Sequence, residues 1–230
     1  MKMNLKLIVA LTILSITVSI NSQTKKETFS KKIKYTPKVG LTIANHKEKS
    51  EIGNSDTKRK AILGFMVGVG MNKPINEHLS IESGVYLTQK GSKSVDEGFS
   101  DGEEFYSYSD VLKMLYIDVP LLAQYTLFES DEGGLAFYGG VQPSLLLNAK
   151  QTNKTANSEN KETVTNFFKK FDVAATLGVG YLFPNGISIH ARYDHGLTDI
   201  NVDSTPNGSN YFKTYNRVFK FSVGYQLGRK

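Results

Sequence analysis

Residues 218–227 read VFKFSVGYQL, and this stretch decides the fold class because its hydrophobic residues recur at every second position. In an extended chain Phe219, Phe221 and Val223 lie on one face, whereas Lys220 and Ser222 lie on the other. A period of two residues is that of a β-strand, and the helix period of 3.6 residues would not separate the two sets. The stretch therefore predicts a strand with one apolar and one polar face.

The same alternation recurs upstream, clearly in some segments and more weakly in the first two and the fifth. A tilted strand needs about 9 to 11 residues to cross a bilayer, and each segment has about that length. The eight predicted strands are 35–44, 61–71, 79–90, 115–127, 135–147, 171–183, 187–197 and 218–227.

The connections between these segments alternate in length, which places long and short loops at opposite ends. The short connections are 72–76, 128–133 and 184–186, and the long polar ones are 45–60, 91–111, 149–169 and 199–214. Tight periplasmic turns and long extracellular loops are typical of outer-membrane barrels with an even number of strands. Both ends of the chain would then lie on the periplasmic side.

Glycine indicates which face of the strands is inside. A soluble barrel or a sandwich also alternates, but it has no need for small residues on a polar outer face. The interior of an eight-stranded barrel is just wide enough for side chains, so it needs small residues beside large polar ones. The predicted fold is an all-β, eight-stranded antiparallel up-and-down transmembrane β-barrel. Ten of the 20 glycines occupy the polar face: Gly40, Gly64, Gly68, Gly70, Gly84, Gly140, Gly178, Gly180, Gly196 and Gly224.

The N-terminus has the features of an export signal. Lys2 and Lys6 flank the start of an uncharged apolar run at 7–20, and small polar residues follow it. An uncleaved anchor is the alternative, but a spanning helix needs about 20 apolar residues. We expect a signal peptide (1–22), a periplasmic N-terminal segment (23–34) and an outer-membrane barrel domain (35–228). The expected location is the outer membrane of a diderm bacterium.

Composition excludes several classes of function. The chain contains no cysteine, which rules out disulfides, cysteine-ligated metals and a thiol nucleophile. Removal of Lys2 and Lys6 with the signal lowers the formal net charge from +6 to +4. That charge is too small to indicate nucleic acid. For a protein of the outer membrane the expected partners are lipid and lipopolysaccharide, with envelope or secretion-system proteins as further candidates.

Five motifs resemble those of the PorT-like family of outer-membrane β-barrel proteins. Residues 116–122, YIDVPLL, are similar to that family's Y-[IL]-[ED]-[IV]-P-L-L signature. The resemblance implies an outer-membrane barrel over nearly all of the mature chain. It also implies a possible link to protein export, because the family's namesake takes part in type IX secretion. The other motifs are YLTQKG at 86–91, YGG at 138–140, Asp172 with LGVG at 177–180, and RYDHGLTD at 192–199.

The predicted inner face carries four acidic and four basic residues. Charges buried in a narrow barrel must be paired or they cost several kcal/mol each, so we predict a structural ion network that plugs the lumen. A proton or ion path is the alternative. No cofactor is expected there. The predicted network consists of Lys38, Glu82, Lys90, Asp118, Asp172, Arg192, Asp194 and Lys220.

The long connection at 91–111 is acidic and aromatic, with six acids against Lys93, whereas 45–60 carries a formal charge of +2. The two could pair with one another over the barrel mouth. Aromatic residues in a polar loop also suit a protein-docking surface. The candidate docking residues are Phe99, Phe105, Tyr106 and Tyr108.

Enzymatic and metal sites have little support. Ser188, His190 and Asp194 share one strand face, and some lipid-modifying outer-membrane acyl hydrolases or transferases use a serine, a histidine and a carboxylate. Steps of two residues span roughly 6 to 7 Å, so the spacing does not by itself bring these side chains into hydrogen-bond contact. Residues 199–203, DINVD, resemble half of a calcium loop. The glycine and the bidentate glutamate that complete such a loop are missing, so an ordinary polar loop is expected.

Pro120 and Pro143 fall within predicted strands, and each should mark a bulge or a missing ladder bond, with a kink at Pro120.

The expected function is a binding or assembly component of the outer membrane. The alternatives are a free-standing structural or small-solute transport barrel and, third, a lipid-modifying enzyme.

Overall fold

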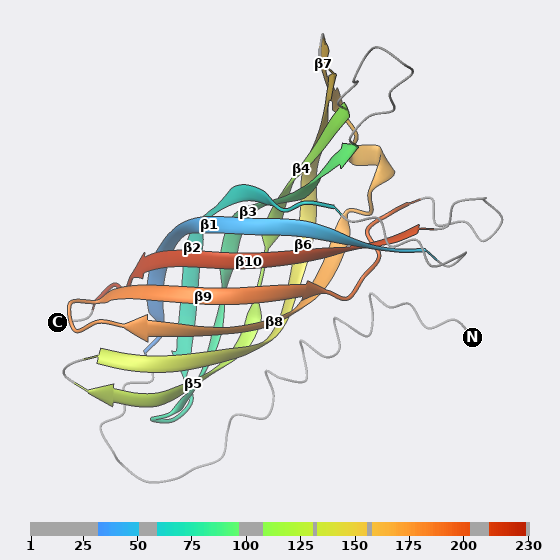
Figure 1. Ribbon diagram of the computed structural model, residues 1–230. Coiled ribbons are helices and arrows are strands. Elements are labelled where there is room, and N and C mark those ends of the chain that lie inside the picture. Colours follow the sequence, from blue (N-terminus) through green and yellow to red (C-terminus); the bar gives the residue numbers. More distant parts are fainter. Residues whose placement is uncertain are drawn as a thin grey trace, which may run out of the picture. The chain divides into compact units, whose positions relative to one another are not determined.

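The computed structural model describes residues 32–50, 59–96, 108–130, 133–155, 158–202 and 212–228. The described chain is almost entirely strand, with one short 3-10 helix at Thr165–Phe167 (Figure 1). None of its helices is long and apolar enough to cross a membrane. The strands are β1 (Lys34–Ser50), β2 (Ile62–Pro74), β3 (Leu79–Asp96), β4 (Tyr108–Asp118), β5 (Leu121–Ser130), β6 (Gly133–Thr155), β7 (Ser158–Thr163), β8 (Phe171–Leu182), β9 (Ile187–Gly196) and β10 (Phe212–Tyr225).

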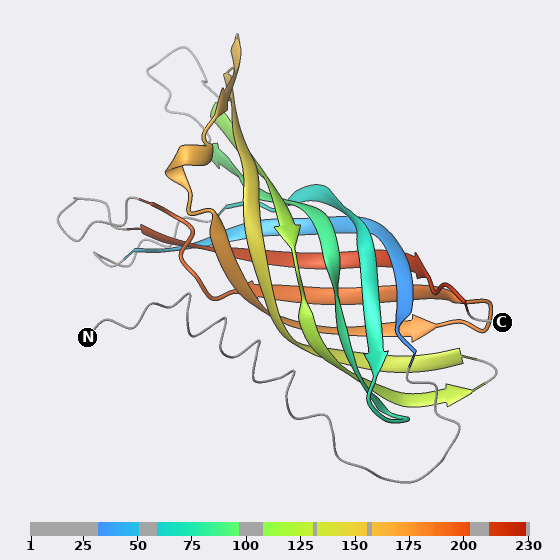
Figure 2. The same cartoon turned by 180° about the vertical axis from the view of Figure 1, so that it is seen from behind.

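The strands form one antiparallel sheet that closes on itself. The sheet runs β2-β1-β10-β9-β8-β6-β4-β3, and the pairing of β2 with β3 completes the ring. β4 and β5 share one place in the wall, because each pairs with β3 on one side and β6 on the other. β7 pairs with β6 alone. The wall therefore has eight places, and the predicted all-β up-and-down barrel is confirmed (Figure 2).

The fourth place in the wall is broken at Val119 and Pro120, as the proline predicts. Proline has no N–H to donate to a ladder, so the strand stops and restarts. Pro143 lies on β6 at the same junction, where the partner of β6 changes from Leu121 of β5 to Asp118 of β4. β6 itself continues through Pro143, whose carbonyl accepts a hydrogen bond of 2.9 Å from the Val119 N–H.

Two of the short connections are confirmed as tight turns, at 75–78 and 184–186, and 131–132 of the third lie outside the described residues. The prediction that the long connections are loops is partly wrong. β1, β3 and β6 continue for several residues past their predicted ends, β4 and β10 begin early, and β7 lies within the predicted loop at 149–169. Polar side chains occupy both faces of much of these extensions, with His46, Ser92 and Thr214 buried on the inward face and lysines on the outward one, so hydrophobic alternation fades while ladder hydrogen bonds persist. β6 and β7 form an arm that projects beyond the barrel wall (Figure 1).

The two faces of the wall differ as predicted. Large apolar side chains point outward along the wall, and on every strand of the wall except β4 some of them are 37–66% exposed. A bulge at Leu147 shifts the register of β6 against β4, so that the buried positions change from Leu146 to Ala149. Several outward aromatic side chains lie near the short turns: Tyr35, Tyr125, Tyr181, Phe183 and Tyr225. Tyr193 lies apart from them and packs on Phe219 with ring centroids 4.6 Å apart.

Candidate functional site

All eight residues of the predicted ion network lie on inward positions of the barrel and form two clusters. The first is centred on Glu82, which lies near the short-turn end of β3. Its carboxylate accepts hydrogen bonds from Lys38 on β1, at 2.9 Å, and from Arg192 on β9, at 2.6 Å. β3 and β9 are separated by three strands on either side of the ring, so the Arg192–Glu82 pair joins opposite walls.

The second cluster joins three carboxylates to two ammonium groups. Lys220 on β10 lies 2.7 Å from both Asp118 and Asp194, and Lys90 on β3 lies 3.1 Å from Asp118. Lys90 also lies 3.9 Å from Asp172 on β8. β10 and β4 are again separated by three strands in each direction, so the Lys220–Asp118 pair is a second bridge between opposite walls.

Neutral side chains complete the second cluster, and the sequence interpretation did not include them. For all of them except Thr198, which follows β9, an inward position on a strand of the wall was the signal that could have identified them. Each carboxylate of this cluster accepts further hydrogen bonds, which offset the cost of removing it from water. The donors are Ser144 to Asp118 at 2.7 Å, Thr176 and Gln142 to Asp194 at 2.8 and 3.0 Å, and Thr198 and Asn216 to Asp172 at 2.6 and 2.9 Å.

Tyrosine rings line the charged interior. The Arg192 guanidinium carbon lies 4.5 Å from the ring centroid of Tyr138, and the Lys90 ammonium nitrogen lies 4.4 Å from that of Tyr116. Both distances are within the range of cation–π attraction. Gly180 makes room for the first contact, because a Cβ atom there would lie 2.8 Å from the Tyr138 hydroxyl. Small and large inward residues therefore fit together as the glycine pattern predicts.

An apolar cluster fills the long-loop end of the barrel, and the sequence interpretation missed it. Met114 and Tyr116 of β4 are fully buried there beside Ile200, which follows β9. Val164 precedes the 3-10 helix and is also buried in this cluster. Backbone hydrogen bonds hold the two connecting segments together, among them Lys169 N–H to the Ile200 carbonyl at 2.7 Å. The sequence signal for this cluster was weak, because each of the two connecting segments contributes a single aliphatic residue, Val164 or Ile200, flanked by polar residues.

The candidate Ser–His–Asp constellation does not form a catalytic relay. His190 Nε2 lies 3.1 Å from the Ser188 hydroxyl, closer than the strand spacing alone predicts. Its Nδ1 lies 3.2 Å from the Tyr138 hydroxyl, whereas Asp194 bonds to Thr176, Gln142 and Lys220. A relay needs the carboxylate on the second imidazole nitrogen. Ser188 and His190 are also buried inside the barrel.

The remaining sequence candidates lie in the loops. Of the docking residues, Phe99, Phe105 and Tyr106 lie outside the described residues, and only the backbone of Tyr108, the first residue of β4, is described. In the segment that resembles half a calcium loop, Asp199 Oδ1 accepts hydrogen bonds from the N–H groups of Asn201 and Thr214. No cluster of three possible metal ligands occurs among the residues that the structure describes.

Comparison with known proteins places the chain in a family. The model of the outer membrane protein beta-barrel domain matches residues 21–202. The chain belongs to this family. Its members' barrels lie in the outer membrane, and so the protein is an outer-membrane β-barrel of a Gram-negative bacterium. The narrower PorT-like assignment remains a resemblance of motifs. No curated protein matches the sequence.

Several solved outer-membrane proteins are similar in fold. OprG of Pseudomonas aeruginosa is 13% identical, with 85% of this chain and 95% of that chain covered and a TM-score of 0.42. Ail, the attachment invasion locus protein of Yersinia pestis, is 14% identical, with coverages of 84% and 98% and a TM-score of 0.40. Neisserial surface protein A is 14% identical, with coverages of 84% and 95% and a TM-score of 0.40.

Proposed function

We propose that this barrel is a non-conducting binding component of the outer membrane, with a plugged lumen and a docking surface on its long-loop side. The observation that carries the proposal is the pair of ion bridges between opposite walls, Arg192–Glu82 and Lys220–Asp118. A continuous water path would have to pass both bridges. Eight-stranded barrels have interiors that side chains can fill, which supports closure.

The apolar cluster supports closure independently. Met114, Val164 and Ile200 pack together where the barrel meets its long loops. An ion entering from outside would have to displace these side chains before reaching the charged clusters. The lumen would thus be closed in two ways, by charge pairing in the middle and by apolar packing at the outer end.

The β6–β7 arm is the best described candidate for docking. All six residues of β7 are exposed, and within the described residues the strand pairs only with β6. An exposed strand edge can bind a partner strand through its backbone groups. The edge is short and carries Glu159, Lys161 and Glu162, features that discourage indiscriminate pairing. A specific partner is therefore favoured over general aggregation.

Cross-linking in intact cells tests the binding role. We would compare the tagged wild type with a variant in which residues 153–160 are replaced by Asn-Gly, so that the paired residues Thr152 and Lys161 flank a two-residue turn. A deletion of 97–104 serves as the matched control in the connection between β3 and β4. The proposal expects an envelope protein that cross-links to the wild type and to the control but not to the arm variant.

Recovery of the protein alone, or of the same partners with the arm variant, would contradict docking by the arm. Stoichiometric secretion-machinery subunits would support the link to type IX secretion that the motif resemblance implies. Recovery alone would favour a free-standing structural barrel. A lipid-modifying enzyme is the third candidate, and release of acyl chains from lipid A by the purified protein, abolished in His190→Ala, would support it.

A further inference from the structure

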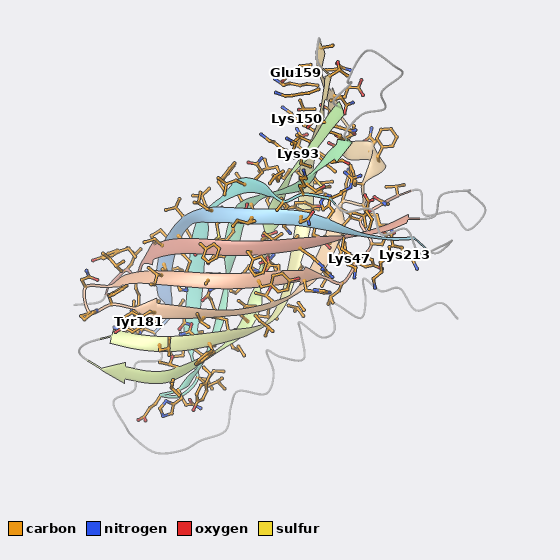
Figure 3. All side chains as sticks on the ribbon, viewed as in Figure 1. Lys47, Lys93, Lys150, Glu159, Tyr181 and Lys213 are labelled. Atoms are coloured by element: carbon orange, nitrogen blue, oxygen red, sulfur yellow. The ribbon has the colours of Figure 1, made fainter. Side chains whose placement is uncertain are left out.

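Outward-facing basic residues gather at the long-loop end of the barrel. They occupy outward positions of five strands, and none of the described outward positions of these strands at that end is acidic. Figure 3 labels Lys93 and Lys150 near the base of the β6–β7 arm and Lys47 and Lys213 at the same end of the barrel. The basic band comprises Lys47, Lys49, Lys93, Lys113, Lys150, Lys154, Lys213 and Arg217, with Lys60 just before β2.

Two pairs of lysines in this band lie directly opposite one another. Lys113 of β4 is the register partner of Lys150 of β6. Lys60 and Lys93 form an antiparallel bridge, with N–H to carbonyl distances of 2.7 and 2.9 Å in the two directions. Side chains in such positions have Cβ atoms about 5 Å apart, and like charges placed there destabilise a sheet. The band therefore carries an electrostatic cost that an anion would relieve.

These four lysines have no acidic partner among the residues that the structure describes, whereas other lysines nearby do. Lys154 and Lys161 share Glu159, at 2.8 and 2.9 Å, and Lys169 lies 3.2 Å from Asp199. The sheet thus supplies carboxylates beside some lysines of this region. At Lys60, Lys93, Lys113 and Lys150 it does not.

The position of the band indicates the kind of anion. On β6 the outward residues Leu145 and Leu147 are 46% and 45% exposed, and Lys150 follows them toward the long loops. On β4, Leu115 is the outward residue next to Lys113. Lysines that lie just beyond a lipid-facing apolar surface reach the headgroup level of the membrane. Phosphate is the anionic group at that level, and ammonium groups bind it as point charges.

We propose that this basic band binds the phosphate groups of outer-leaflet lipopolysaccharide, with the Lys60/Lys93 and Lys113/Lys150 pairs as its core. A phosphate between two opposed ammonium groups replaces their repulsion with two attractions. The inference depends on the outer-membrane location and not on the closure of the lumen or on docking by the arm.

The test compares stability in nanodiscs of phosphatidylcholine with and without diphosphoryl lipid A. The variants are Lys113→Gln/Lys150→Gln and the matched control Lys73→Gln, an outward lysine on β2 near the short turns. The readout is the urea midpoint from the band shift on cold SDS gels, because the chain has no tryptophan. Lipid A should raise the midpoint of the wild type and of the control, and the double variant should lose most of this rise.

The two lipids should also reverse the sign of the substitution's effect. Without lipid A, the double variant should be at least as stable as the wild type, because the substitution removes a repulsion. With lipid A, it should be less stable. An equal loss of stability in both lipids would overturn the proposal and point to the chain's own acidic stretch at 97–107 as the partner. Lipid A from which both phosphates have been removed should not raise the midpoint; an equal rise with it would leave the acyl chains as the cause and would equally contradict the proposal.

Discussion

The middle and the outer end of the lumen are filled by opposite chemistry. In the middle, the buried charges of Lys90, Lys220 and three aspartates are stabilised by opposite charges within the same cluster. At the outer end, the contribution of Met114 and Ile200 to stability depends on how well their apolar side chains fill the space. Substitutions in the middle should therefore lower the free energy of unfolding more than substitutions at the outer end, because an unpaired buried charge costs far more than a small cavity.

The largest effect is expected at Asp118, which contacts both lysines of the second cluster. Asp118→Asn leaves two buried ammonium groups with one carboxylate fewer. We expect the free energy of unfolding to fall by about 3–5 kcal/mol, the usual cost of removing one partner of a buried ion pair. Urea titration in detergent or lipid, followed by the band shift on cold SDS gels, measures the change.

A second substitution should repair part of this damage. Asp118→Asn/Lys90→Met removes the lysine that keeps only a 3.9 Å contact with Asp172, whereas Lys220 keeps Asp194 at 2.7 Å, so the double variant should be more stable than Asp118→Asn alone. If the double variant were instead less stable than the single one by the full cost of a further lost partner, the lysines would not be coupled through Asp118.

An intermediate effect is expected at the apolar outer end. Ile200 is fully buried, and Ile200→Ala should lower the free energy of unfolding by about 2 kcal/mol, the low end for a core truncation, because its loop can partly collapse. Val202→Ala is the control, since Val202 lies in the same segment but is 49% exposed. Equal losses of stability for the two variants would show that the cluster does not pack at the mouth.

The smallest effect is expected from packing around the first cluster. At Gly180 a Cβ atom would lie 2.6 Å from His190 Nδ1 and 2.8 Å from the Tyr138 hydroxyl. Gly180→Ala should therefore disturb the Tyr138–His190 contact and cost about 1 kcal/mol. At Gly139, on the outer face, a Cβ atom would meet only Leu177, at 3.5 Å, so Gly139→Ala should be near neutral in the same urea titration. A larger loss at Gly139 would contradict the packing of the interior.

The sequence predicted the parts of this molecule that repeat every two residues. Strand alternation located the wall, and the charged inward positions, Glu82 and Asp118 among them, are the ones that meet across the lumen. Pro120 predicted the break in the fourth place of the wall. Each of these signals is local, because the pleat alone decides which face a side chain takes.

The remaining features depend on contacts between distant segments. Val164 and Ile200 are single aliphatic residues in polar stretches, and nothing in either stretch indicates that they pack together. The strand extensions at the long-loop end lack a clear hydrophobic alternation because polar residues occupy both faces, as buried His46 and outward Lys47 do on β1. The pairing of Lys113 with Lys150 depends on the bulge at Leu147, which no local residue pattern had indicated.

Single-channel recording tests the closed lumen most directly. Purified protein, refolded free of host porins, would be inserted into a planar bilayer, with an open porin as the positive control. If the Arg192–Glu82 and Lys220–Asp118 bridges and the apolar cluster close the lumen, the protein should insert without discrete conductance steps. The gel band shift would confirm that the protein is folded. Stable, reproducible single-channel steps from the wild-type protein would contradict closure of the lumen.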